Sequence, residues 1–196
     1  FGISGVGGIY NVDTLSVISS TLSGNSSSGG AGGIYSSGVL TMSTSTVASN
    51  QGSSCGGIYN TGSFVMSGSS LANNSGNSYS GGIFNSNTAS LVVISSSVAS
   101  NRSNASNGGG ISSAGALALV NSTIADNSTN AGGGGIYNSG VLTATRSVFV
   151  NNRVPFVGGG VLNGGRATIE NSTFFSNTAG IDGSIRNEQA LTLTNS

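Results

Sequence analysis

The sequence predicts an all-β protein: a right-handed parallel β-helix (β-solenoid) of about eight coils of about 25 residues, with three short strands per coil. Two observations predict it. An aliphatic residue follows a pair of small residues, usually glycines, at spacings of 25, 24, 25, 28, 25, 25 and 24 residues, and a fixed period of this size indicates units that stack on their neighbours. Apolar residues also alternate with a period of two, which is typical of strands. The repeated aliphatic positions are Ile9, Ile34, Ile58, Ile83, Ile111, Ile136, Val161 and Ile185.

The first strand of each unit begins at this aliphatic residue. The aliphatic position admits no polar side chain, whereas the next position accepts tyrosine, serine or arginine. Because successive side chains of a strand point to opposite faces, we expect the first to face the core and the second to face water. The residues expected to face water are Tyr10, Tyr35, Tyr59, Phe84, Ser112, Tyr137, Leu162 and Arg186.

The second strand has two apolar positions separated by one residue, six and eight residues after the aliphatic position. The fourth unit fits this pattern if two extra residues are placed in the turn at 86–90. The first position holds Leu15, Leu40, Phe64, Leu91, Leu117, Leu142, Ala167 and Leu191. The second position holds Val17, Met42, Met66, Val93, Leu119, Ala144, Ile169 and Leu193.

The third strand has one inward residue, with a serine two places before it and an asparagine three places after it. A variable loop rich in glycine, serine and asparagine then leads to the next unit, so residues 1–196 are expected to form a single β-helix domain. The inward residues are Leu22, Val47, Leu71, Val98, Ile124, Phe149 and Phe174. The serines are Ser20, Ser45, Ser69, Ser96, Ser122, Ser147 and Ser172.

Asparagines recur at two corners of the predicted coil, where stacked amides can hydrogen-bond along the axis and satisfy the backbone of turns. We predict that both columns form structural ladders. The first ladder is Asn25, Asn50, Asn74, Asn101, Asn127, Asn152 and Asn177. The second is Asn11, Asn60, Asn85, Asn138, Asn163 and Asn187, with Ser36 and Ser113 in the remaining coils. Glycosylation acceptor patterns, which a repeat of this composition generates by chance, occur at Asn25, Asn73, Asn101, Asn104, Asn121, Asn127 and Asn171.

The composition argues against several function classes. Charged residues are 5% of the chain and the formal net charge is zero, so no basic surface is available for nucleic acid. Apolar runs such as LVVI (91–94) are far shorter than the ~18 residues that span a bilayer, so no membrane insertion by this segment is expected. Histidine is absent and Cys55 is the only cysteine, so no metal site or cofactor is expected. Cys55 is interpreted as a small buried or turn residue, with an intermolecular disulfide as the alternative.

The units resemble a known group of bacterial proteins. The motif GGIYN, together with FVNN (149–152) and FFSN (174–177), is similar to the GGxx and FxxN repeats of polymorphic outer membrane proteins. More broadly, the chain resembles bacterial extracellular right-handed parallel β-helix proteins with GGGIYNSG-type units, and the resemblance covers all eight units. It implies adhesins, autotransporter-like passengers and other exported proteins. Leucine-rich repeats share the period but return through a helical segment, which the Gly-Gly-Ile-Tyr-Asn return does not match.

An enzymatic alternative follows from the same fold, because parallel β-helices include pectin lyases and polygalacturonases. Such enzymes need clustered carboxylates. The acidic residues here fall on different faces or distant coils, and we expect no catalytic residues. Glu170 is placed to meet Arg146 of the preceding coil as a surface ion pair. The five acidic residues are Asp13, Asp126, Glu170, Asp182 and Glu188.

The outward aromatic row is the candidate binding or stacking ladder, because a row of rings can stack on sugars or on a partner. It consists of Tyr10, Tyr35, Tyr59 and Phe84 and resumes at Tyr137. A second outward row of threonines is reminiscent of ice-binding faces, but it is interrupted by Val65, Val92 and Ala118. The threonines are Thr41, Thr143, Thr168 and Thr192.

Neither end of the sequence has a polar cap of the kind that repeat rods use against edge-to-edge association. We therefore expect either a slice of a longer rod or a filament subunit. The sequence predicts an extracellular or cell-surface, non-enzymatic structural rod, filament or surface-layer building block, or adhesin stalk. Self-association is the expected partnership, and a glycan or cell-surface partner is a further candidate. The alternative function is a carbohydrate-binding or carbohydrate-active β-helix protein.

Overall fold

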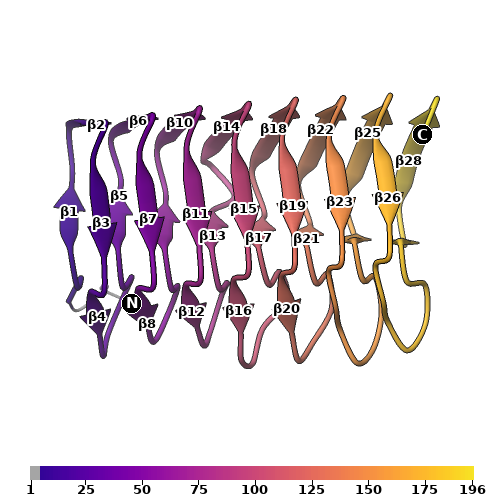
Figure 1. Ribbon diagram of the computed structural model, residues 1–196, viewed down its shortest axis with the longest axis horizontal. Helices are drawn as coiled ribbons and strands as arrows, with labels where there is room; N and C mark the ends of the chain where they lie inside the picture. Colours follow the sequence, from indigo (N-terminus) through magenta and orange to yellow (C-terminus); the bar gives the residue numbers. More distant parts are fainter. Residues whose placement is uncertain (1–4) are drawn as a thin grey trace.

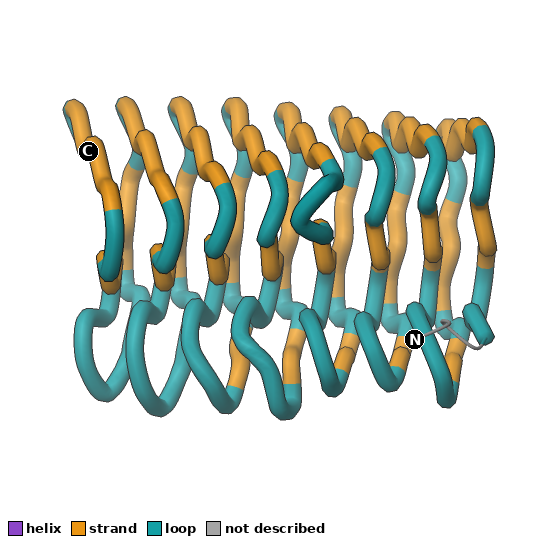
Figure 2. The backbone as a smooth tube through the Cα atoms, turned by 180° about the vertical axis from the view of Figure 1, so that it is seen from behind, coloured by secondary structure: helices purple, strands orange, loops and turns teal. Residues whose placement is uncertain are grey.

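The computed structural model describes residues 5–196 and confirms the predicted parallel β-helix (Figure 1). The described residues contain 28 strands and no helix, and all strand pairs between coils are parallel. The chain winds as a rod, with corresponding strands of successive coils side by side and the loops gathered along one edge (Figure 2). Three to four short strands make up each full coil.

Sheet A collects the strands that follow the glycine pairs. Its strands pair in register, so that Ile9 lies opposite Ile34 and Ile136 lies opposite Val161. In coil order they are β1 (Ile9–Asn11), β5 (Ile34–Ser36), β9 (Ile58–Asn60), β13 (Ile83–Asn85), β17 (Ile111–Ser113), β21 (Ile136–Asn138), β24 (Val161–Asn163) and β27 (Ile185–Asn187).

Sheet B carries two inward residues per strand. Phe64 pairs with Leu91, which confirms the two extra residues predicted in the turn at 86–90. Its strands are β2 (Thr14–Ile18), β6 (Val39–Ser43), β10 (Ser63–Ser67), β14 (Ser90–Ile94), β18 (Ala116–Val120), β22 (Val141–Thr145), β25 (Arg166–Glu170) and β28 (Ala190–Thr194).

Sheet C contains the third strand of each unit, and its central residues face the core. Ile124, for example, lies between Val98 and Phe149. Its strands are β3 (Thr21–Ser23), β7 (Thr46–Ala48), β11 (Ser70–Ala72), β15 (Ser97–Ala99), β19 (Thr123–Ala125), β23 (Val148–Val150) and β26 (Thr173–Phe175).

Sheet D was not predicted. Its two-residue strands lie in the segment that the sequence assigns to a variable loop, and they are too short to show an apolar alternation. They are β4 (Ser26–Ser27), β8 (Gln51–Gly52), β12 (Ser75–Gly76), β16 (Arg102–Ser103) and β20 (Ser128–Thr129).

The core is a set of four stacked apolar columns inside the coil, as the sequence predicts. Side chains at the middle of the rod are fully buried, including Phe64 and Phe149. The ring of Phe149 stacks on that of Phe174, with centroids 4.5 Å apart and an interplanar angle of 1°. At the outermost coils the same columns are only partly buried, as at Ile9 and Ile185. Each coil therefore depends on a neighbour on both sides to bury its apolar residues.

The glycine pairs are required by the close approach of neighbouring coils. A Cβ atom on Gly134 or Gly135 would stand 2.6 Å from the carbonyl oxygen of Gly159 or Gly160, respectively, in the next coil. The same segment pairs through its backbone, since the amide of Ile136 donates to the oxygen of Gly160 at 2.9 Å. Residues 131–140, AGGGGIYNSG, are thus a joint between coils.

Two corners of each coil are turned by a single residue with positive φ. Most of these residues are not glycine, although the left-handed region costs an L-residue roughly 1–2 kcal/mol. The corner between sheets B and C holds Ser19, Thr44, Gly68, Ser95, Asn121, Arg146, Asn171 and Asn195. The corner between sheets C and D holds Gly24, Ser49, Asn73, Ser100, Asp126, Asn151 and Ser176.

Replacing Thr44 by glycine is expected to stabilise the protein by up to about 1 kcal/mol, because a β-branched residue at φ 49° is strained. The reciprocal change, Gly68→Thr, places the same side chain at the equivalent corner, where a Cβ would meet nothing within 4 Å. It should therefore destabilise through strain alone, by about 1–2 kcal/mol. Urea denaturation of both variants measures the two effects, and shifts of the same sign would contradict this account.

Candidate functional site

The candidate aromatic ladder forms a stack on the outer face of sheet A. The rings of Tyr10, Tyr35, Tyr59 and Phe84 follow one another with centroids 4.8–5.5 Å apart. Tyr79, from the loop before β13, joins them at 4.6 Å from Phe84 and 5.5 Å from Tyr59. The sequence pattern missed Tyr79 because it lies outside the repeated positions.

The rings of this stack contact mainly one another. Tyr10 and Tyr35 are nearly parallel, with an interplanar angle of 11°. Tyr10 is 60% exposed and Tyr79 is 40% exposed, whereas Tyr35, Tyr59 and Phe84 are half-buried. Burial raises the pKa of Tyr59 to about 12, and the neighbouring phenols of Tyr79 and Tyr35 add to the shift. The geometry supports a role in coil-to-coil packing for these residues.

Tyr137 does not join the stack. Ser112 lies in register between Phe84 and Tyr137, so the row is interrupted. The expectation that this position always faces water is wrong for Ser112 and Leu162, which are 7% and 6% exposed. A Cβ on Gly132 would stand 2.6 Å from Leu162 Cδ2, so the loop of the preceding coil covers that side chain. The repeated sequence pattern does not predict the path of a loop that covers an outward side chain.

Two of the five acidic residues, Asp182 and Glu188, meet at one arginine, and the other three form no ion pair within the part of the chain that the structure describes. No group of three or more histidine, cysteine, aspartate or glutamate side chains within residues 5–196 is placed to hold a metal ion. The ion pairs there join Arg186 to Asp182 at 3.0 Å and to Glu188 at 3.6 Å. The hydrogen bond and charge of Asp182 raise the pKa of Arg186. These exposed pairs contribute little to stability.

The predicted ion pair between Arg146 and Glu170 does not form. Arg146 Nε instead donates to Asn121 Oδ1 of the preceding coil at 2.8 Å. Both Arg146 and Asn121 occupy the positive-φ corner between sheets B and C, which directs their side chains toward each other along the axis. The repeat pattern places each charge in a coil but does not indicate the direction in which a left-handed corner points its side chain.

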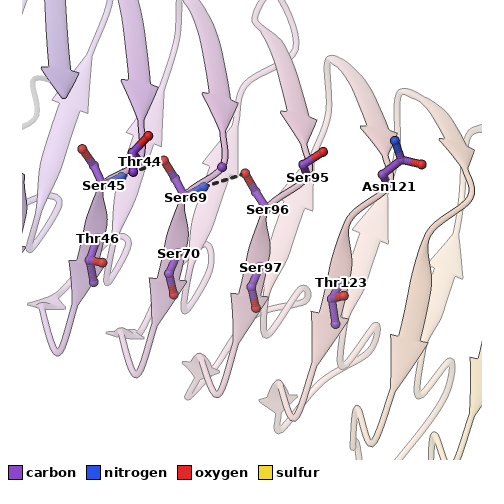
Figure 3. A pocket seen from close by; sticks show the side chains of 11 residues that line it. Thr44, Ser45, Thr46, Ser69, Ser70, Ser95, Ser96, Ser97, Asn121 and Thr123 are labelled. Atoms are coloured by element: carbon purple, nitrogen blue, oxygen red, sulfur yellow. Dashed lines mark hydrogen bonds between the residues drawn. The ribbon is translucent and has the colours of Figure 1, made fainter. Parts of the chain in front are cut away.

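A groove of about 500 Å³ runs along the corner between sheets B and C (Figure 3). Hydroxyl groups line this groove. The hydroxyls of one column of serines, Ser45, Ser69 and Ser96, already form hydrogen bonds within the protein. The hydroxyl of Ser45 accepts the backbone N–H of Ser20 and donates to the oxygen of Ser43, and Ser69 and Ser96 continue the same pattern. The serine column is thus a third side-chain ladder. The hydroxyls of Thr46, Ser70, Ser97 and Thr123 remain at the surface.

The first asparagine ladder is confirmed and is continuous. Each side-chain amide donates to the Oδ1 of the next asparagine, at 2.9 Å from Asn25 to Asn50 and 3.0 Å from Asn50 to Asn74. Each Oδ1 also accepts the backbone N–H of the previous asparagine, and each interior Nδ2 also donates to a backbone oxygen such as that of Leu22. All four bonding positions of an interior amide are therefore used. The remaining links run through Asn101, Asn127, Asn152 and Asn177.

The second ladder is confirmed but is interrupted at its serines. Asn85 donates to the hydroxyl of Ser113, which in turn donates to the oxygen of Gly115 and not to Asn138. The Oδ1 of Asn138 is consequently buried without a hydrogen-bond partner. The ladder resumes from Asn138 to Asn163 at 2.7 Å. A short side chain in one coil thus leaves an unpaired acceptor in the next.

Cys55 is fully buried and free, as the main interpretation predicts. It occupies the same column as Ala31 and Ser80, and its Sγ lies 3.2 Å from the oxygen of Ile58. Burial raises the pKa of the thiol to about 12. A thiol in this state does not react readily.

The glycosylation acceptor patterns divide by burial. Asn101 and Asn127 are fully buried in the first ladder, whereas Asn73, Asn121 and Asn171 are exposed at corners. Only exposed positions are accessible to modification of the folded protein. Among the residues that the structure describes, none belongs to a helix that would be long and apolar enough to cross a membrane.

No family model, no curated protein and no solved structure matches this chain.

Changing Ser113 to asparagine is expected to stabilise the protein by about 1–2 kcal/mol, because the new amide would supply the missing donor to Asn138 Oδ1. Six of the eight coils carry asparagine at this position. The matched control is Ser36→Asn. There the next amide in the ladder, Asn60, already accepts the N–H of Gly62 at 3.2 Å, so a smaller gain is expected. Equal gains in denaturation experiments would show that the unpaired acceptor carries no cost.

The raised pKa of Cys55 makes stability depend on alkaline pH. The thiol is protonated in both states below its ordinary pKa of 9.0, and above it only the unfolded state releases the proton until about pH 12. The free energy of unfolding should therefore fall by ~1.4 kcal/mol per pH unit in this window. The variant Cys55→Ala should remove this pH dependence of stability. Alanine fits the position, because the neighbouring coil already has Ala31 in the same column. Equal pH slopes for the two proteins between about pH 9 and about pH 10.5 would contradict the assignment.

Proposed function

We propose that this chain is an extracellular or cell-surface structural rod, without enzymatic activity, that extends by stacking coil on coil. The observation that carries the proposal is the uninterrupted register of sheets A and B across all eight coils. Backbone pairing, apolar columns and side-chain ladders all run along the same axis. Such a structure resists bending and separates its two ends at a fixed distance, which is the requirement for a filament subunit, a surface-layer building block or an adhesin stalk.

The surface supports the same proposal. Before Arg102 the only charged residue is Asp13, and the outward positions of the first coils are mainly serine, threonine and asparagine. A surface with so little charge packs against copies of itself without desolvating ions. Among the residues the structure describes, the ion pairs are the exposed ones that Arg186 makes with Asp182 and Glu188, and no three histidine, cysteine, aspartate or glutamate side chains are placed to hold a metal ion.

The outermost described coils explain how stacking would continue. Leu193 occupies an inward position of sheet B but is 48% exposed, whereas Ile169 at the same position one coil earlier is fully buried. The strands β1 and β27 each pair on one side only. A further coil, from this chain or from a second copy, would bury these side chains and complete the backbone pairing. End-to-end association therefore needs no new type of contact.

The filament form predicts particles that lengthen in steps of one subunit, roughly 38 Å for eight coils at ~4.8 Å each. Electron microscopy of the purified protein measures this length. Leu193→Lys places a charge in the apolar end column and should leave single short rods. Val141→Lys is the matched control, because Val141 has a similar exposure of 51% but lies on the side of the rod. Single short rods of the unmodified protein at every concentration would overturn the filament form.

A further inference from the structure

A second groove, of about 380 Å³, lies beside sheet D and differs from the rest of the surface by its charge. Arg102, Ser128 and Arg153 follow one another in register along its floor, in three successive coils. The two arginines are thus about 10 Å apart at their Cα atoms, from two coil steps of ~4.8 Å. The equivalent positions in earlier coils hold Gln51 and Ser75, so the charge is confined to this part of the rod.

Neither arginine forms an ion pair with an acidic residue within the described chain. Arg102 donates through Nε to Asn104 Oδ1 at 3.0 Å, which leaves its two terminal amino groups available. Arg153 makes no side-chain hydrogen bond or ion pair with any described residue. Arg186 differs, since it pairs with carboxylates. Two exposed guanidinium groups on one groove present ten N–H donors in all, of which the protein uses one.

We propose that this groove binds a linear acidic polysaccharide lying along the rod axis, with the oxyanions of separate sugars on Arg102 and Arg153. Guanidinium groups bind carboxylates and sulfate esters through paired, charge-assisted hydrogen bonds. Between the arginines, the half-buried hydroxyl of Ser128 has no partner among the described residues and faces the same groove as Asn130, which suits the hydroxyl groups of the intervening sugar. A ligand with an anionic group on about every second sugar matches this arrangement.

The groove favours a glycan over the other anionic polymers. An extended peptide gains affinity by adding to a free strand edge, but β16 and β20 are paired with each other and Ser128 is also bridged to Arg153. A nucleic acid needs more cations and bases stacked on aromatic rings, and no aromatic residue lines this groove. The choice of a polysaccharide rests on the proposed extracellular location, where such polymers are displayed.

The test uses binding of defined oligosaccharides to the purified protein. The probes are a uronate oligomer, a sulfated oligomer and a neutral oligomer of equal length. The two acidic probes separate carboxylate from sulfate recognition. We expect one or both acidic probes to bind, the neutral probe not to bind, and the affinity to fall as salt is raised. An acidic peptide and a single-stranded oligonucleotide serve as competitors, and displacement of the glycan by an equal concentration of either would overturn the assignment.

Variants locate the site. Arg102→Gln and Arg153→Gln should each weaken binding by about tenfold or more, and the double variant should abolish it. Arg166→Gln is the matched control, since it removes the same charge from an exposed residue of sheet B and should leave binding unchanged. Far-ultraviolet circular dichroism verifies that each variant folds. Binding by the double variant at the level of the unmodified protein, or no binding of either acidic probe to the unmodified protein, overturns the proposal.

The result of the glycan-binding test does not depend on end-to-end association of the rods. The arginines lie on the side of the rod, so electron microscopy of the same variants should show the same particle lengths as the unmodified protein. Loss of glycan binding with unchanged rods isolates the groove. Rods that never lengthen, together with intact glycan binding, would reject the filament while retaining the binding site.

Discussion

The constraint on which this structure depends is the spacing of ~4.8 Å between neighbouring strands, which brings each strand residue of one coil beside its counterpart in the next. An apolar residue is then buried by another apolar residue at the same position. A buried polar residue can be satisfied by its own copy. Asn74, for example, is 1% exposed, and its side-chain amide is satisfied by Asn50, by Asn101 and by the backbone oxygen of Val47. Repetition therefore replaces the varied complementary packing of a globular core.

The same constraint explains why strained corners persist. A non-glycine residue with positive φ is costly by itself, but its position is determined by the paired strands on either side of it. At the corner between sheets C and D, the following residue is always a ladder asparagine, as in Asn73 followed by Asn74. The hydrogen bonds of the ladder hold the chain where the turn requires it. Local strain is tolerated because the stacked neighbours leave no alternative conformation.

Positions that repeat could be predicted from the sequence, and positions that depend on loops could not. The inward columns, both asparagine ladders and the two extra residues in the turn before β14 follow from the period, because the same residue pattern occurs in one coil after another. The burial of Leu162, the place of Tyr79 and the strands of sheet D depend on loops whose length and path vary. The direction of the Arg146 side chain depends on a left-handed corner, which no apolar pattern records.

The inward residues of the strands therefore determine stability, whereas the outward residues determine what the rod can bind. The inward positions must stay uniform, since a substitution in one coil affects its neighbours, as Ser113 does for Asn138. Apart from the aromatic stack on sheet A, the outward positions meet water or loops and can change from coil to coil at little cost. The column that reads Gln51, Ser75 and Arg102 changes charge without altering the strand pairing. On such a rod we consequently expect a specific ligand site where the residue type of an outward column changes from one coil to the next.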